Sequence, residues 1–134
     1  MKTYESILPT LHTLFIEQLP SYIEKINKEK NDGIILPPLQ NKTLFENCQK
    51  LPCFKFTFDK AEYLEKDRII QNTVFDISIE IKTGKSGDAD LICFYRYVDA
   101  INKMLNEFET PVDVMEKEIL QIKENLIILR FIVE

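Results

Sequence analysis

The sequence predicts one α+β domain over residues 1–134, with the element order α-β-β-α-β-β. Three observations lead to this fold class: an apolar stripe of helical spacing near the N-terminus, a strict apolar–polar alternation in "TVFDISIEIK", and a second helical stripe in "LICFYRYVDAINKMLNEF". Because both helices are amphipathic, we expect a mostly antiparallel sheet with the two helices packed on its apolar face. A length of 134 residues suits a single domain.

The first helix is predicted from about residue 6 to residue 30. Its apolar residues recur at gaps of three and four and form one stripe: Ile7, Leu8, Leu11, Leu14, Phe15, Leu19, Tyr22, Ile23 and Ile26. Pro20 lies inside this stripe and removes the hydrogen bond to the carbonyl of Ile16. We therefore expect a kink or a break near Leu19, and an end at the turn-forming "NDG" that follows the stripe.

Residues 31–52 are predicted to form an irregular loop, since Pro37 and Pro38 forbid a helix there. The loop nevertheless carries several apolar residues: Ile34, Ile35, Leu36, Leu39, Leu44 and Phe45. We expect these side chains to pack either against the core of the same chain or against a neighbouring subunit.

Two strands are predicted in "CFKFTFD" and "RIIQNTVFDISIEIKT". Alternation places one set of residues on the core side: Phe54, Phe56 and Phe58 in the first strand, and Phe75, Ile77, Ile79 and Ile81 in the second. The opposite face of the second strand carries Asp76, Ser78, Glu80 and Lys82, which we expect to face solvent or a partner. The charged residues 59–67 between the strands are predicted to form a long, projecting hairpin connection.

The second helix is predicted from about residue 88 to residue 108, with Thr110-Pro111 ending it. Its expected buried stripe consists of Leu91, Phe94, Tyr95, Val98, Ile101, Leu105 and Phe108, with Met104 beside it. A last hairpin then places "KEILQIK" and "LIILRFIVE" on either side of the turn Glu124-Asn125. The final strand is apolar on both faces, interrupted only by Arg130, which is typical of the middle of a sheet or of a subunit interface.

Charge and composition exclude several classes of function. The formal net charge is −5, and basic residues are interleaved with acidic ones, so no basic stripe favours nucleic acid as the main ligand. No run of 18 apolar residues is present, so no membrane-spanning helix is expected. The N-terminus lacks the features of a signal peptide, which makes the cytoplasm the expected location. Three widely spaced cysteines indicate reduced thiols.

The segment "GKSGDAD", residues 84–90, resembles both a phosphate site and a metal site at first sight. A P-loop needs a glycine five residues before Gly84, where this chain has Ile79. An EF-hand that started at Asp88 would place Ile92 and Cys93 at positions where it needs a ligand and a glycine. The segment is better explained as a turn in which two glycines adopt unusual dihedrals and Ser86 or Asp88 caps the helix.

No catalytic, cofactor-binding or metal-binding residues are predicted, and we do not expect an enzyme. His12 is the single histidine, and its pairing with a cysteine has no supporting spacing. Asp76 and Glu80 share a strand face, but four residues of strand separate them by about 13 Å, which is too far for paired carboxylates in glycoside hydrolysis.

The chain as a whole resembles the small tail-terminator and tail-completion (head–tail joining) proteins of tailed phages. The resemblance rests on the order of elements, with a long strand that ends in a polar turn, a helix that reads "L..F.YVDAINKML", and closing strands. It implies a structural, prophage-encoded protein that forms a ring, commonly a hexamer, and contacts other tail or connector proteins. The resemblance implies no catalytic residues. The resemblance implies that the protein lies in the cytoplasm of the bacterial host during assembly, and in the virion if the phage is functional.

The alternative is a host α+β binding or regulatory module, for example a dimeric adaptor with a ferredoxin-like sheet. Oligomeric state and genomic neighbours separate the two hypotheses. For the interface we predict Tyr63 and Leu64 in the hairpin connection, together with the polar strand face that contains Asp76, Ser78, Glu80 and Lys82.

Overall fold

The architecture was established from a computed structural model of the chain, and the structure describes residues 4–38, 43–44, 52–109 and 114–134. The helical elements are α1 (Tyr4–His12), a π-helical segment η1 (Thr13–Gln18), α2 (Leu19–Lys30) and α3 (Gly87–Glu107). The strands are β1 (Cys53–Lys66), β2 (Ile69–Lys82), β3 (Val114–Lys123) and β4 (Leu126–Val133). The predicted α+β fold and the order α-β-β-α-β-β are confirmed.

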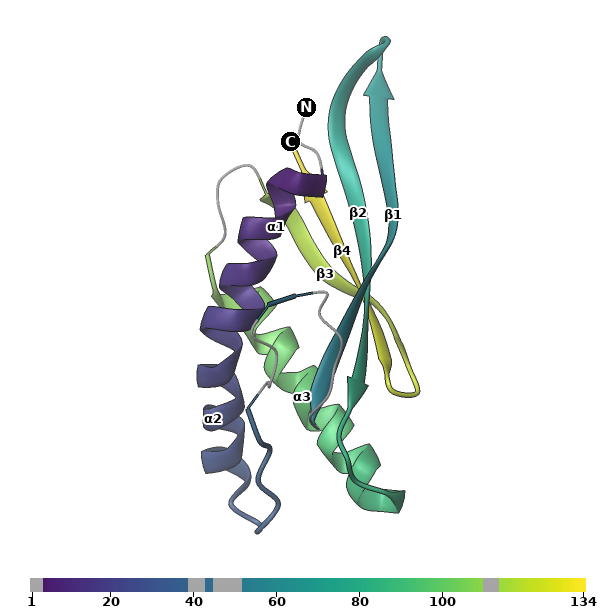
Figure 1. Cartoon of the computed structure of the whole chain (residues 1–134). Coiled ribbons are helices and arrows are strands. Elements are labelled where there is room, and N and C mark those ends of the chain that lie inside the picture. The colour runs from purple at the N-terminus through teal and green to yellow at the C-terminus, as the bar shows by residue number, and fades with distance from the viewer. Residues whose placement is uncertain (1–3, 39–42, 45–51, 110–113) are drawn as a thin grey trace.

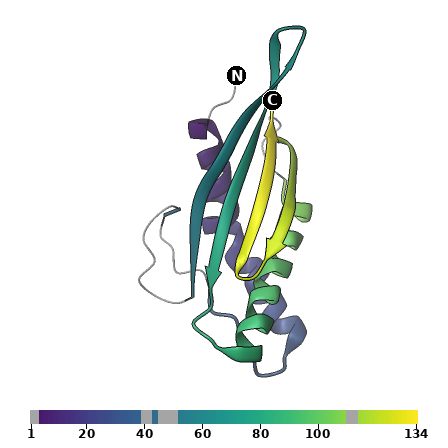
Figure 2. The same cartoon turned by 90° about the vertical axis from the view of Figure 1, so that its right-hand side faces the viewer.

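The four strands form one antiparallel sheet in the order β1-β2-β4-β3. Both long helices lie on the same face of this sheet, and no helix of the described residues lies on the opposite face (Figures 1 and 2). The core fills the space between the helices and the sheet, and its fully buried members include Phe15, Phe54, Phe75, Ile77, Ile79, Tyr97, Leu129 and Phe131. The alternation predicted for β1 and β2 is therefore confirmed.

The first helix runs from Tyr4 to Lys30 and contains the predicted irregularity. Pro20 has no N–H for the carbonyl of Ile16, and the helix widens into the π segment η1 in the turn before it. The backbone N–H of Leu19 donates to the carbonyl of Leu14, five residues back. Asn31 ends the helix in the left-handed conformation, with φ of 42°.

The start of the loop after α2 is fixed by side chains of both helices. Asn27 uses both ends of its amide on Leu36: Nδ2 donates to the Leu36 carbonyl (2.9 Å), and Oδ1 accepts from the Leu36 N–H (2.7 Å). The Tyr97 hydroxyl donates to the carbonyl of Pro37 (2.6 Å). Leu36 is buried in the core and Ile34 and Leu44 pack against it, whereas Ile35 is 71% exposed. Residues 39–42 and 45–51 of the predicted loop lie outside the described residues.

The second helix differs from the prediction in the face that it buries. Its bounds agree within one residue with the predicted 88–108, although the predicted end at Thr110-Pro111 lies outside the described residues. Leu91 and Tyr95, predicted in the buried stripe, are 52% and 53% exposed. The predicted residues Phe94, Val98, Ile101, Met104 and Leu105 are buried, and the buried face also includes Cys93, Tyr97 and Ala100.

The hairpin of β1 and β2 is longer than predicted. Residues 59–67 were expected to be a connection, but β1 continues to Lys66 and β2 begins at Ile69. The two-residue turn consists of Asp67 and Arg68, both with positive φ (54° and 65°), as in type I′ hairpin turns. The residues expected to form the connection are thus mostly strand, stabilised by pairing with β2.

The last strand lies where its composition predicted. β4 pairs with β2 on one side and with β3 on the other, so it is a central strand. Ile127, Leu129, Phe131 and Val133 face the helices and are buried, whereas the alternate residues lie half-exposed on the uncovered face of the sheet. The predicted turn is confirmed: only Glu124 and Asn125 separate β3 from β4, and Asn125 has φ of 62°.

Candidate interaction surfaces

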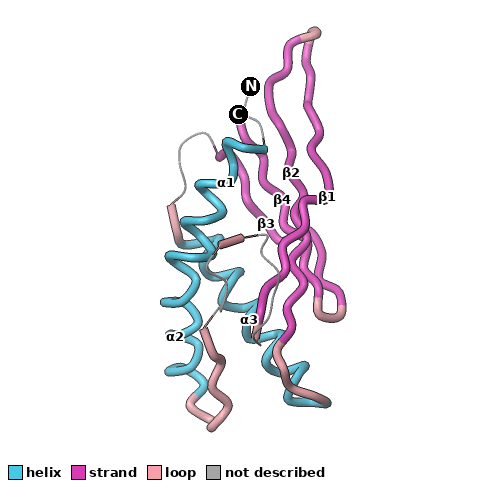
Figure 3. Tube along the Cα trace, viewed as in Figure 1, coloured by secondary structure: helices cyan, strands magenta, loops and turns pink. Residues whose placement is uncertain are grey.

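An arm of two strands extends beyond the rest of the sheet. We define the arm as residues 59–72, the outer parts of β1 and β2 with their turn. Because β4 pairs only with Thr73–Glu80 of β2, the last residues of the hairpin continue without a third strand (Figures 1 and 3). Every β1 residue of the arm is exposed. The predicted interface residues Tyr63 and Leu64 both lie on the arm, 48% and 41% exposed, and Ile69 beside the turn is 66% exposed.

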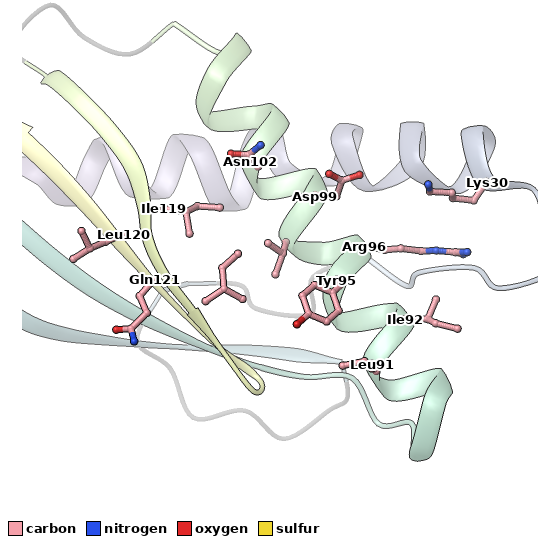
Figure 4. A pocket seen from close by; sticks show the side chains of 12 residues that line it. Lys30, Leu91, Ile92, Tyr95, Arg96, Asp99, Asn102, Ile119, Leu120 and Gln121 are labelled. Carbon is pink, nitrogen blue, oxygen red and sulfur yellow. The ribbon is translucent and has the colours of Figure 1, made fainter.

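A hollow of about 920 Å³ lies over the exposed face of α3. Figure 4 shows α3 crossing the middle of the hollow, with β3 on one side and Lys30, the last residue of α2, on the other. We call this surface the α3–β3 hollow. Its exposed apolar side chains are Leu91, Ile92 and Tyr95 from α3 and Leu120 and Ile122 from β3. None of these five residues was predicted as an interface residue.

An irregularity in β3 contributes to this surface. The pairing between β3 and β4 shifts between Ile119 and Gln121, so Leu120 is the extra residue of a bulge. Leu120, Gln121 and Ile122 are consecutive and all exposed, which strict strand alternation against a core would not allow. The sequence signal for this surface is that the apolar residues Ile119, Leu120 and Ile122 in "KEILQIK" do not keep to a single face of a regular strand.

The predicted polar face of β2 proves to be largely occupied by its own chain. Asp76 is only 6% exposed, and Arg130 of β4 binds it with two hydrogen bonds, Nε to Oδ1 (2.8 Å) and NH2 to Oδ2 (2.9 Å). Lys60 adds its ammonium at 3.7 Å. These hydrogen bonds and charges hold the pKa of the Asp76 carboxyl below its usual range.

The remaining residues of that face differ in accessibility. Ser78 is buried, and its hydroxyl donates to the carboxylate of Asp59 on β1. Glu80 is half-exposed and Lys82 exposed, with 3.9 Å between the Lys82 ammonium and the Glu80 carboxylate. The structure therefore brings the four predicted residues together along one strand but leaves only Glu80 and Lys82 open to a partner. The role of this face in an interface stays a prediction.

The turn at residues 84–90 is held by bonds within the chain. Gly84 and Gly87 have φ of 76° and 61°, as the prediction of unusual dihedrals requires. The capping prediction for Ser86 is wrong: Ser86 occupies the N-cap position but makes no side-chain cap bond. Instead, the Thr83 hydroxyl donates to Asp90 (2.5 Å) and accepts from the N–H of Lys85 (3.1 Å). These bonds tie the end of β2 to the first turn of α3.

A second tie joins the loop to α3 at the edge of the hollow. The Arg96 guanidinium donates to the carboxylate of Asp32 and to the carbonyl of Ile34, with 3.0 Å and 3.2 Å from NH1 to the two oxygens. The pKa of the Asp32 carboxyl is lowered to about 2, mainly by the hydrogen bond from the Arg96 guanidinium. Arg96 lines the hollow, and this contact fixes its head group in place.

The residues considered for chemistry do not converge within the described part of the chain. His12 lies half-exposed near Glu17, with 3.9 Å from Nδ1 to the carboxylate. Cys53 and Cys93 are buried thiols, and burial raises the pKa of Cys93, the opposite of what a reactive thiolate needs. Cys48 lies outside the described residues. Among residues 4–38, 43–44, 52–109 and 114–134, no three His, Cys, Asp or Glu side chains gather so that they could hold a metal ion.

Fold and surfaces together define a single-domain α+β protein with one covered sheet face, a protruding arm and an exposed apolar hollow. None of the helices in the described part of the chain has the length and apolar character needed to cross a membrane. Comparison of the sequence with models of protein families finds no match, and comparison with curated proteins finds none either.

Proposed function

We propose that this chain is a structural subunit that assembles with copies of itself into a ring, as in the tail-terminator and tail-completion proteins of tailed phages. One observation carries the proposal: the arm projects past the sheet and presents Tyr63, Leu64 and Ile69 to solvent. Exposed apolar residues that cluster on a projecting element are typical of contacts between macromolecules.

The distribution of polar and apolar side chains supports the same proposal. A site for a small substrate usually combines a concave, mostly apolar pocket with a few polar groups placed to bind the ligand. Here the buried side-chain nitrogen and oxygen atoms of the described residues all have hydrogen-bond partners, so none is held ready for a ligand. Apart from Ile35, the large apolar residues left exposed lie on the arm or around the α3–β3 hollow. In the proposed ring, tail or connector proteins would bind the remaining exposed surfaces.

Sedimentation velocity and native mass spectrometry of the full chain test the proposal. We expect one defined oligomer that electron microscopy shows as a closed ring. A protein that stays monomeric at every concentration would contradict ring assembly. The position of the coding sequence among capsid and tail genes tests the phage context separately, because a host dimeric module would have other neighbours.

A further inference from the structure

We infer that the arm of one copy docks into the α3–β3 hollow of a second copy, in a head-to-tail contact. The inference rests on the proposed function, since it requires that copies of the chain assemble, and it names the contact through which they do so. Its occupant is a second copy of this chain because the chain itself carries both an uncovered apolar arm and an uncovered apolar receptor surface.

The arm needs a covering partner on both of its faces. Successive residues of a strand point to opposite faces, so Tyr63 and Leu64 place one apolar side chain on each face of the arm. Two-stranded ribbons are only marginally stable in water without a third element that packs on them. An arm with an exposed apolar side chain among the charged residues of each face is better buried by insertion between two elements than by lying on a flat surface.

The hollow offers such a place between elements. Its floor carries Leu91, Ile92 and Tyr95 of α3, and β3 adds Leu120 and Ile122 at one side. The polar lining residues Lys30, Asp99, Asn102 and Gln121 surround these apolar groups, and all four are exposed. An apolar centre with a polar, solvent-accessible rim is the usual arrangement of a protein–protein contact.

The two surfaces lie too far apart to meet within one chain. The sheet register places Ile122 opposite Ile127, and Ile127 opposite Ile79 of β2. Ile69, next to the turn of the arm, is ten residues further along β2, which is about 33 Å of strand. Arm tip and hollow therefore occupy opposite ends of the molecule, and a contact between them joins different copies.

This geometry also fixes the kind of assembly. A contact between two different surfaces of the same chain is heterologous, so each subunit can donate its arm and accept another. Such a contact generates a ring when the rotation between neighbours closes, and a filament when it does not. An isologous dimer would instead pair arm with arm or hollow with hollow.

Side chains rather than backbone pairing would make the contact at β3. β3 is an edge strand, but it carries two bulges and the charged residues Glu116, Lys117, Glu118 and Lys123. Bulges and charges on an edge disfavour the addition of another strand. The exposed side chains of Leu120 and Ile122 remain available to pack against an inserted arm.

Disulfide trapping between two single variants tests this contact directly. In a Cys48→Ser background, one preparation carries Leu64→Cys on the arm and the other carries Tyr95→Cys in the hollow; both positions are exposed, and the native Cys53 and Cys93 are buried. After mixing and mild oxidation, we expect covalent dimers in the mixture and none in either preparation alone. Dimers from Leu64→Cys alone, or from Tyr95→Cys alone, would show an isologous contact and overturn the inference.

The oligomeric state of the same samples separates the two proposals. If sedimentation shows an oligomer but no sample forms the mixed dimer, the arm–hollow contact is wrong while ring assembly stands. If every sample is monomeric, ring assembly is contradicted and the contact falls with it.

A truncation series gives an independent measure. The double variant Tyr63→Ala/Leu64→Ala is expected to raise the dissociation constant of the assembly at least about tenfold, because a few buried apolar anchors carry most of the binding free energy of an interface. Ile35→Ala is the matched control, since Ile35 is 71% exposed and lines neither surface. An unchanged dissociation constant for the double variant, or an equal loss for the control, would overturn the inference.

Discussion

The two halves of the β1–β2 hairpin share one backbone ladder but have opposite surroundings. In the inner half, Phe56, Ile77 and Ile79 point into the space between sheet and helices and are buried. In the outer half, the arm, residues 59–66 are all exposed although they too are paired with β2, with register shifts between Phe58 and Lys60 and between Leu64 and Glu65. Backbone pairing thus extends the ribbon, whereas packing against the helices supplies most of the folding free energy.

The largest expected difference comes from matched truncations in the two halves. Ile77→Ala should lower the free energy of unfolding by about 2–5 kcal/mol, because it leaves a cavity in a fully buried site. Leu64→Ala on the arm should change it by no more than about 0.5 kcal/mol in the monomer. Urea denaturation of both variants measures the contrast. Similar losses in the two would show that the arm belongs to the cooperative core.

An intermediate effect is expected where the two halves join, at Asp76 and Arg130. Asp76→Ala removes two hydrogen bonds between charged groups and should cost about 1–3 kcal/mol. Glu62→Ala is the control, since the exposed Glu62 carboxylate meets Lys60 at 3.2 Å and such pairs contribute little.

The same ion pair makes a prediction about pH. Because the folded state lowers the pKa of Asp76, its contribution is fully present above the unfolded pKa of about 3.9 and is lost as pH falls through the lower, folded pKa. Denaturation at neutral and at acidic pH should therefore show the wild type and Asp76→Ala converging in acid. A difference that is independent of pH would contradict the assignment of this pKa shift to Arg130.

A smaller effect, in the opposite direction, is expected at the tip of the arm. Arg68 holds φ of 65° at a turn position that favours glycine, so Arg68→Gly should stabilise the arm by up to about 1 kcal/mol. Hydrogen exchange of the arm amides measures this stabilisation apart from that of the inner half. Arg68→Ala keeps the unfavourable backbone and should give no gain; an equal gain would point to the loss of the side chain instead.

The smallest effect on stability is expected on the uncovered sheet face. Glu80→Lys reverses a half-exposed charge beside Lys82 and should change the free energy of unfolding by about 0.5 kcal/mol or less. If this face contributes to an interface, the variant should nevertheless weaken assembly, as sedimentation would report. Unchanged assembly would remove the polar face of β2 from the predicted interface and leave the arm.

The sequence predicted the inner half of the hairpin well and the outer half poorly, for a physical reason. Phe75, Ile77 and Ile79 alternate with polar residues because one face of the strand is buried, and that alternation is readable. The arm of β1 is rich in Asp, Lys and Glu, which have low intrinsic preference for strands. Its strand conformation follows from pairing with β2, which no local pattern in β1 records.

The sequence did not predict the α3–β3 hollow, because it does not show which residues of α3 the fold buries. Leu91 and Tyr95 share helical spacing with truly buried residues, so a count of apolar positions assigned them to the core. Cys93, Tyr97, Ala100 and Met104 also have gaps of four, three and four, and this second stripe faces the interior. Phe94, Val98, Ile101 and Leu105 of the predicted stripe are buried as well, so only the packing against the sheet decides that Leu91 and Tyr95 at its edge are exposed.

The π segment in the first helix determines which way the two ends of that helix face. Each α-helical residue turns the chain by about 100°, so over the 19 residues from Ile7 to Ile26 an unbroken α-helix would leave these side chains about 100° apart around the axis. One wide turn absorbs a single residue and brings both into the core, where both are buried. The π segment thus shifts the buried side of the helix by one residue. Which residues after it face the core therefore depends on that one extra residue.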